Sequence, residues 1–341
     1  MTFREHFKKG RILTMEEFIA KLIKEAQERL GDNYSLEQVT ATKTNNQKYT
    51  GIQVRTEGNP VSPVFYVQNF YKDYLNGKYT FHECLSIFIR EIKEHMQISI
   101  DTTNLLNYDH IKDDICVRLI NYEANEELLK ELPHFRILDL AAIFYYRITL
   151  PDNSIGTMNI SHQMLETWEM NPEDFINTCM HNFYTKNYVM ISDIKDALSM
   201  LAEKTGRQFL LNELEELAMP RGHLFVLTGA NSIHGACMLL HTQALHQFAT
   251  EHNDNMIIYP SSVHECLIAF ESDEKAAKLP ANEVAYINQT MLEPEERLSN
   301  SVYLYDRHLK ELRILYQGIS LAKLDDVSST IKKINDRLGG I

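Results

Sequence analysis

The sequence predicts an α+β protein. We expect a helix–β-meander–helix N-terminal unit, followed by a mixed α/β unit with an antiparallel sheet and one strand–helix–strand crossover. Two observations lead to this prediction. Several segments carry apolar residues at three- and four-residue steps, the spacing of one helix face, and several others are short apolar runs bounded by turn residues. One stretch, residues 223–270, combines both patterns in the order strand, loop, helix, strand.

Residues 223–270 hold the clearest periodicity and the densest group of histidines and cysteines in the chain. Residues 223–228 are a short apolar run typical of a buried strand, and residues 234–252 have the pattern of a single helix. The residues expected to share the apolar face of this helix are Cys237, Leu240, His241, Ala244, Leu245 and Phe248.

A second strand is expected at residues 256–259, and a strand–helix–strand unit of this length favours parallel strands. The next apolar run, residues 263–270, begins too soon afterwards for another crossover. We therefore expect a bend at residues 260–262 and an antiparallel partner strand.

Residues 1–100 are expected to form the helix–meander–helix unit. Residues 15–30 have helical periodicity, and Thr14 is expected to cap this helix with Glu17 as its reciprocal partner. The strands of the unit are expected at residues 36–42, 49–56 and 64–67, and its further helices at residues 69–76 and 80–95.

The rest of the chain is divided into three further parts. Residues 101–222 are predicted to hold antiparallel strands plus helices, and residues 223–318 the mixed α/β unit. Residues 319–341 are expected to form a polar C-terminal tail helix, because their few apolar residues recur at helical spacing.

Composition excludes several classes of function. A formal net charge of −13 argues against nucleic-acid binding, which needs a basic surface. No apolar run is long enough to span a membrane, and the first residues lack the pattern of a signal peptide. The five dispersed cysteines, without a Cys-x-x-Cys pair, indicate reduced thiols. We therefore expect a cytoplasmic protein that binds neither nucleic acid nor membrane.

Several segments, in this order along the chain, carry a resemblance to a known family. They are Thr50-Gly-Ile, Pro60-Val-Ser-Pro, Val117-Arg-Leu-Ile-Asn-Tyr-Glu123, Glu126–Leu129, Leu138-Asp-Leu-Ala, Pro260-Ser-Ser-Val-His-Glu265 and Pro294-Glu-Glu-Arg-Leu-Ser-Asn-Ser-Val-Tyr-Leu-Tyr-Asp306. Together they resemble the DUF5688 family of uncharacterised bacterial proteins from gut Firmicutes. A weaker likeness to the DUF1444 family covers the C-terminal half. The resemblance implies a cytoplasmic bacterial protein, and implies neither an activity nor catalytic residues.

Metal binding is the first candidate chemistry. The candidate ligands are His234, Cys237, His241, His264 and Cys266. Cys237 and His241 are four residues apart on the predicted helix, a spacing that suits two ligands of one metal. That face is also the apolar face, where cysteine packs as a small apolar residue, and no His-Glu-x-x-His pattern is present. Packing is the favoured reading, and no cofactor is expected.

Hydrolysis is the second candidate, with Ser261 or Ser262 as nucleophile, His264 as the base and Glu265 beside it. A histidine can take the proton of a serine hydroxyl that lies within hydrogen-bond reach. A Gly-x-Ser-x-Gly elbow is absent, however, and Pro-Ser-Ser is an ordinary turn signal. We favour the alternative in which the serine hydroxyls stabilise the bend.

Phosphate binding is the third candidate. Residues 229–235 form a loop between a strand and a helix, where backbone N–H groups can hold an anion. Neither a Gly-x-Gly-x-x-Gly nor a Gly-Lys-Ser/Thr pattern is present, and His234 is the only basic group. A tight connection is therefore the favoured reading of these glycines.

Partner binding is the fourth candidate and the one we favour. The block 293–306 is acidic and aromatic, and its candidate contacts are Glu295, Glu296, Tyr303, Tyr305 and Asp306. The two tyrosines alternate along a predicted strand, so they face one side of a sheet, where they either bind a peptide or cover the core. The sequence thus favours a non-catalytic protein- or peptide-binding module, with the hydrolase as the alternative, and fixes no oligomeric state.

Overall fold

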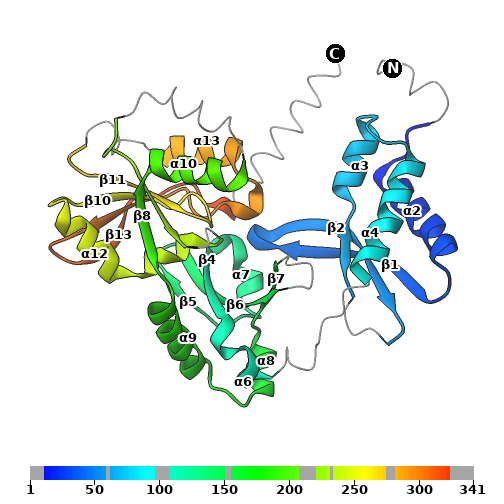
Figure 1. Cartoon of the computed structure of the whole chain (residues 1–341), viewed down its shortest axis with the longest axis horizontal. Helices are drawn as coiled ribbons and strands as arrows, with labels where there is room; N and C mark the ends of the chain where they lie inside the picture. The colour runs from blue at the N-terminus through cyan, green and yellow to red at the C-terminus, as the bar shows by residue number, and fades with distance from the viewer. Residues whose placement is uncertain are drawn as a thin grey trace. The chain divides into compact units, whose positions relative to one another are not determined.

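The computed structural model confirms the α+β class (Figure 1). It describes residues 11–58, 62–96, 107–149, 155–206, 220–230, 233–273 and 281–322. The chain divides into two compact units. The first comprises residues 1–43, 47–110 and 148–156, and the second residues 44–46, 111–147 and 157–341.

The first unit contains an antiparallel three-stranded sheet in the order β1 (Tyr34–Lys43), β2 (Gln47–Thr56), β3 (Val64–Tyr66). Its helices are α2 (Met15–Leu30), α3 (Gln68–Leu75) and α4 (Phe81–Met96). The core between sheet and helices is apolar, and its fully buried side chains include Phe18, Leu22, Ile52, Val54 and Phe88. The predicted hairpin and the helices that follow it are confirmed.

The start of α2 confirms the predicted capping box. The Glu17 amide donates to Thr14 Oγ1 at 3.2 Å, and the Thr14 amide donates to Glu17 Oε2 at 2.9 Å. These two bonds satisfy backbone donors that have no partner inside the helix. The sequence therefore sets the start of this helix locally.

The second unit contains a smaller sheet in the order β4 (Ile115–Asn121), β6 (Leu140–Thr149), β5 (His134–Ile137), and β7 (Ile155–Asn159) also pairs with β6. The helices of this unit before the larger sheet are η3 (Lys112–Asp114), η4 (Glu123–Asn125), α7 (Glu126–Leu129), α8 (His162–Thr167) and α9 (Pro172–Lys186); the short helix α6 (Tyr108–Ile111) spans the division between the units along the chain. Of these helices, α9 packs on β4. The two pieces η4 and α7 follow each other directly along the chain.

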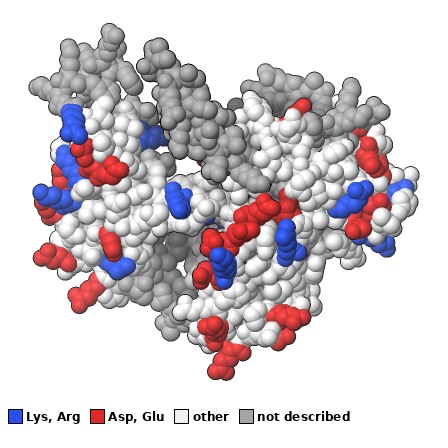
Figure 2. Space-filling model, turned by 180° about the vertical axis from the view of Figure 1, so that it is seen from behind, with Lys and Arg blue, Asp and Glu red and all other residues white. Residues whose placement is uncertain are grey.

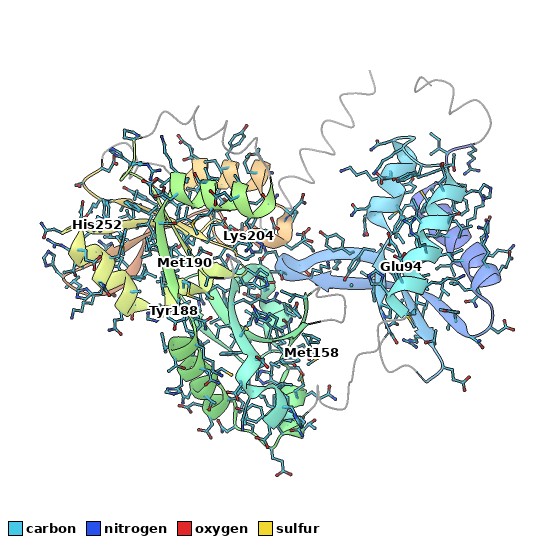
Figure 3. All side chains as sticks on the ribbon, viewed as in Figure 1. Glu94, Met158, Tyr188, Met190, Lys204 and His252 are labelled. Atoms are coloured by element: carbon cyan, nitrogen blue, oxygen red, sulfur yellow. The ribbon has the colours of Figure 1, made fainter. Side chains whose placement is uncertain are left out.

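The larger sheet of the second unit has six strands in the order β13-β12-β10-β11-β9-β8, and every neighbouring pair is antiparallel. The strands are β8 (Val189–Asp193), β9 (Phe225–Gly229), β10 (Met256–Tyr259), β11 (Cys266–Phe270), β12 (Val302–Asp306) and β13 (Glu311–Tyr316). Strand β8, in which Met190 is labelled in Figure 3, pairs with β9. The domain boundary expected after residue 222 would therefore divide this sheet.

Helices cover both faces of the six-stranded sheet. One face packs against α13 (Ala281–Met291) through Ile257, Leu304 and Val284. On the other face Phe225 contacts Phe248 of α12 (Thr242–Glu251), with ring centroids 5.2 Å apart. The remaining helices of this part are α10 (Ile194–Thr205), η5 (Gly235–Leu240) and η6 (Pro294–Glu296).

The crossover between β9 and β10 differs from the expectation in one respect. The bend after β10 and the antiparallel partner β11 are confirmed. However, β11 also pairs with β9, so it lies between β9 and β10 and separates the two strands that were expected to be parallel neighbours. The two strands still run in the same direction, because each is antiparallel to β11.

The single helix predicted over residues 234–252 is wrong. The segment forms the 3₁₀ helix η5 and the α-helix α12, and His241, with φ −84° and ψ 67°, interrupts the helical backbone between them. All six residues of η5 are buried. Gly235 lies so close to its neighbours that a Cβ atom there would be 2.1 Å from Thr228 Oγ1 and 2.5 Å from the carbonyl oxygen of His264. This tight packing overrides the apolar periodicity.

Within the described residues, no helix is long and apolar enough to cross a membrane. On the face drawn in Figure 2, the basic side chains of the described residues are scattered among acidic ones. Most of the tail helix expected at residues 319–341 lies outside the described residues.

Replacing Gly235 with alanine tests the close packing of η5. We expect Gly235→Ala to lower the free energy of unfolding by about 3 kcal/mol, because the backbone of residues 229 and 264 leaves no space for a methyl group. Urea unfolding of the full chain measures this loss. Gly229→Ala is the matched control, since its Cβ would meet only the flexible Met238 side chain, at 3.3 Å, and should cost less than about 1 kcal/mol. Equal losses would contradict this account of the connection.

Candidate functional site

The histidines of the central stretch meet at the connection between β9 and η5. His234 precedes η5 with φ 51°, a left-handed conformation that a residue other than glycine adopts only under local constraint. Its backbone amide donates to His264 Nδ1 at 3.3 Å, and the two imidazole rings are stacked with centroids 5.7 Å apart. The loop thus holds His234 and His264 against each other.

This arrangement orients the His264 ring. Since Nδ1 accepts the amide of His234, the ring proton is assigned to Nε2, which lies 3.6 Å from Glu296 Oε1. Glu296 comes from the block 293–306, so the structure brings one predicted partner-binding residue next to one predicted catalytic residue. The contact lies at the surface, because about a third of His264 and rather more of Glu296 are exposed.

Ser262 interacts with the backbone of the bend. Its hydroxyl is buried and accepts the amide of His264 at 3.0 Å, so the serine contacts the main chain of His264 rather than the ring. Ser262 also hydrogen-bonds to Glu265, whose carboxyl has its pKa raised by burial, an effect that His264 and Ser262 partly oppose. Ser262, the candidate nucleophile, and His264, the candidate base, are close in sequence. The Ser262 hydroxyl nevertheless bonds to the backbone of the turn and not to the His264 ring.

Of the five candidate metal ligands, His234 and His264 lie against each other, but the five do not converge on one point. Burial raises the pKa of the Cys237 thiol to about 12 and that of Cys266 further still, so both thiols are protonated at neutral pH. The His241 ring packs against Phe183 and Tyr184. Among the described residues, no three His, Cys, Asp or Glu side chains lie close enough to share a metal ion.

The tyrosines of the block 293–306 lie in the core. Tyr303 and Tyr305 are both 0% exposed, so in this structure they cover the sheet and an incoming partner cannot touch them. Asp306 accepts the amides of His308 and Leu309, which stabilise its charge and lower its pKa. Glu295 and Glu296 belong to η6 and are partly exposed.

Asp139 organises this block. Its Oδ2 accepts the hydroxyls of Ser299 at 2.6 Å and Ser301 at 2.9 Å, and its Oδ1 accepts the Tyr303 hydroxyl. Ser299, Ser301 and Tyr303 are fully buried. The carboxylate therefore accepts the protons of three buried hydroxyls.

Arg118 of β4 is a site residue that the candidate chemistries above do not include. Its guanidinium lies over the Tyr145 ring at 5.6 Å, and its Nη2 donates to Asn159 Oδ1 at 2.8 Å. The Tyr145 ring also contacts the His234 ring, at 5.3 Å between centroids. Because Arg118 and His234 are 116 positions apart, no local pattern could have joined them.

The surroundings of His234 change the pKa of its imidazole. Burial, together with the smaller effects of the nearby Arg118 and His264, lowers its pKa from 6.5 to about 4. His234 is therefore neutral at physiological pH.

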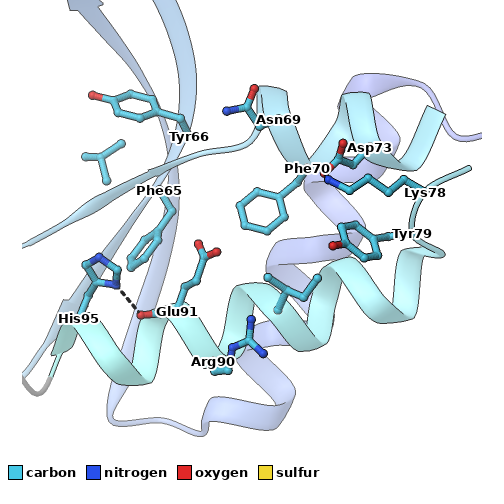
Figure 4. Close-up of a pocket in the computed structure, with 12 residues that line it drawn as sticks. Phe65, Tyr66, Asn69, Phe70, Asp73, Lys78, Tyr79, Arg90, Glu91 and His95 are labelled. Carbon is cyan, nitrogen blue, oxygen red and sulfur yellow. Dashed lines mark hydrogen bonds and ion pairs between the residues drawn. The ribbon is translucent and has the colours of Figure 1, made fainter. Parts of the chain in front are cut away.

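A groove in the first unit is the second site that the sequence did not reveal (Figure 4). It has a volume of about 500 Å³, and three elements line it. They are strand β3, helix α3 with the turn after it, and helix α4, which contribute Val64, Phe65, Tyr66, Asn69, Phe70, Asp73, Lys78, Tyr79, Ile87, Arg90, Glu91 and His95. The groove thus combines aromatic rings with both signs of charge.

Several charges of the groove have partners, either within it or on the exposed side of helix α4. Lys78 Nζ lies 2.8 Å from Asp73 Oδ2, and Arg90 lies 3.9 Å from Glu94. Glu91 differs: Figure 4 shows its side chain reaching between Phe65 and Phe70, and among the described residues no hydrogen bond or ion pair engages its carboxylate. Burial raises the pKa of Glu91, opposed by His95 and Arg90.

These observations define an α+β protein of two units, with a histidine–arginine cluster in one unit and an aromatic groove in the other. The chain belongs to a family described as a family of unknown function, DUF5688, whose model matches residues 15–307. The likeness to the DUF1444 family is not shown by the comparisons. Neither the curated proteins nor the solved structures give a match.

The stability of the protein should depend on the protonation of His234. The folded pKa of about 4 lies below the ordinary 6.5, so acid protonates the unfolded chain first and favours unfolding as the pH falls between these values. Allowing for partial exposure, we expect a loss of about 2 kcal/mol between pH 7 and pH 4.5 from this group.

His234→Asn tests this dependence, because asparagine tolerates the left-handed backbone and does not titrate. Urea unfolding of both proteins at several pH values should show the wild type losing more stability than the variant as the pH falls. Parallel curves would show that His234 is not held in its neutral form.

Proposed function

We propose that this protein is a non-catalytic protein- or peptide-binding module, and that the groove of the first unit binds an extended segment of its partner. The observation that carries the proposal is the groove of about 500 Å³ between the edge strand β3 and helix α4. A groove between an edge strand and a helix is a recurring geometry for binding an extended peptide by strand addition.

The position and register of β3 support strand addition. β3 is the last strand of its sheet, and within the described residues it pairs only with β2. The Val54 amide donates to the Pro63 carbonyl, and the Val67 amide donates to the Thr50 carbonyl. Since hydrogen-bonded pairs alternate along an antiparallel ladder, the backbone groups of Val64 point away from β2. They are placed to bond an added strand.

The aromatic lining supports the binding of a side chain from that segment. Phe65, Phe70 and Tyr79 line the groove with Tyr66, and Phe65 and Phe70 both pack edge-to-face against Phe88, with centroids 5.7 and 5.9 Å apart. These contacts fix the rings before a ligand arrives, which reduces the entropy cost of binding. Aromatic rings favour apolar groups and cations.

Glu91 gives the groove a preference for a positive charge. A carboxylate without an internal partner, flanked by aromatic rings, favours the ammonium of lysine or the guanidinium of arginine. We therefore propose that the bound segment carries a lysine or arginine between apolar residues.

As part of the same proposal, the protein works in the cytoplasm. All five cysteines are free thiols, and Cys84, Cys179, Cys237 and Cys266 are buried, which suits a reducing compartment. The family resemblance supports a bacterial setting.

The hydrolase centred on Ser262, His264 and Glu265 stays the alternative prediction. The hydrogen bond from the His264 amide to the Ser262 hydroxyl gives it less support than the groove gives to binding. A hydrolytic activity that His264→Ala abolishes in a folded protein would reverse this preference.

A peptide-binding assay tests the proposal with the full chain. The probe is a fluorescent library of ten-residue peptides with apolar flanks and a central lysine or arginine, compared with the same library carrying glutamate. We expect saturable binding of the basic library, and a loss of about tenfold in affinity for Glu91→Gln, which is about 1.4 kcal/mol.

Glu94→Gln is the matched control. Glu94, labelled in Figure 3, lies on the same helix three residues further on, and its side chain is 64% exposed and pairs with Arg90. The Glu94→Gln variant should bind the peptides with the same affinity as the wild type. If neither library binds the wild type, the groove is not a peptide site. If the basic library binds but Glu91→Gln binds equally well, the role given to Glu91 is wrong.

A further inference from the structure

Arg118 is a partly buried cation without a counterion among the described residues. Its polar contact in the structure is with the neutral side chain of Asn159, and the ring below it is that of Tyr145. Burial lowers the pKa of the guanidinium, which shows that its charge is poorly solvated here. A charge removed from water without an opposite charge destabilises the folded state, so this residue needs an explanation.

Two buried nitrogens near Tyr145 have no hydrogen-bond partner among the described residues. They are Arg118 Nε and His234 Nδ1. The Tyr145 ring touches both side chains, with its centroid 5.6 Å from Arg118 Cζ and 5.3 Å from the His234 ring centroid. Unsatisfied buried nitrogens are uncommon, and both of these belong to side chains that contact the Tyr145 ring.

The connection that carries His234 is constrained as a functional loop would be. His234 has a left-handed backbone, its amide is bonded to His264 Nδ1, and the next residue, Gly235, contacts the backbone of β9 and of residue 264. Such strain persists only where the surrounding structure fixes the backbone. The ring of His234 is therefore placed beside Arg118 by tight packing.

From this geometry we infer that the second unit binds a small oxyanion, a phosphate or carboxylate group, with Arg118 as the charged donor and His234 beside it. The guanidinium Nε–H would donate to the anion, and neutral His234 would donate a ring N–H. This site is separate from the peptide groove of the first unit and does not depend on it.

Direct binding of two simple anions tests the inference. Inorganic phosphate and acetate are titrated separately into the full chain at constant ionic strength, with isothermal titration calorimetry and thermal unfolding as readouts. We expect saturable binding of at least one of them with a rise in Tm. A preference for phosphate identifies a phosphate group, and a preference for acetate a carboxylate. Lack of saturable binding of both would overturn the inference.

Arg118→Gln and Arg136→Gln form a matched pair for this titration. Arg136 also lies over a tyrosine ring, that of Tyr122 at 4.3 Å, but its Nε already donates to the Leu138 carbonyl at 2.9 Å. We expect Arg118→Gln to weaken anion binding by about tenfold or more and Arg136→Gln to leave it unchanged. Equal binding by Arg118→Gln and the wild type would overturn the inference.

Asn159→Asp supplies a second test that keeps Arg118 in place. A carboxylate at Asn159 would lie 2.8 Å from Arg118 Nη2 and act as a built-in counterion. In buffer free of phosphate and carboxylates we expect the Tm of this variant to rise by about 3 °C, with anion affinity reduced about tenfold or more. If the anion affinity and the Tm of Asn159→Asp both equal those of the wild type, Arg118 does not bind an anion and the inference is wrong.

Discussion

The carboxylate of Asp139, which accepts three hydroxyls, is the contact on which the second unit most depends. Asp139 lies in the turn between β5 and β6 of the smaller sheet, and the hydroxyls belong to Ser299, Ser301 and Tyr303 at the start of β12. One charged group thereby joins the two sheets of the unit. Hydrogen bonds to a charged group are stronger than neutral ones, and loss of the carboxylate would deprive three buried hydroxyl protons of this acceptor.

The same contact positions the segment that precedes β12. The carbonyl of Leu298 accepts the side-chain amide of Asn121 at 3.1 Å, at the end of β4. Ser299 and Leu298 donate their backbone amides to the carbonyls of Pro260 and Ser261. The segment is thus bonded to the smaller sheet on one side and to the bend after β10 on the other, which brings Glu296 to His264.

Each unit contains one charged side chain without an internal counterion, and the two charges have opposite signs. In the first, the Glu91 carboxylate lies among aromatic rings without an internal cation. In the second, the Arg118 guanidinium lies on an aromatic ring, and its side-chain partner is the neutral Asn159. In proteins, buried charges are normally paired, so each uncompensated group favours a ligand of the opposite charge. Both readings rest on contacts between residues distant in sequence.

What the sequence determined by itself was local. The spacing of apolar residues and the pair Thr14 and Glu17 were sufficient for α2, and turn residues were sufficient for the β1–β2 hairpin and the bend between β10 and β11. These features depend on backbone groups and side chains a few residues apart, so a single sequence contains the information.

The tertiary structure decided which neighbour covers each apolar face and which polar groups meet. It placed β11 between β9 and β10, interrupted the predicted helix at His241, buried Tyr303 and Tyr305, and put Arg118 and His234 against one ring, that of Tyr145. An apolar periodicity shows that a face is buried, but the partner that buries it lies far away along the chain. For that reason the sequence motifs gave only local candidates, and the charges without an internal partner appeared only in the folded structure.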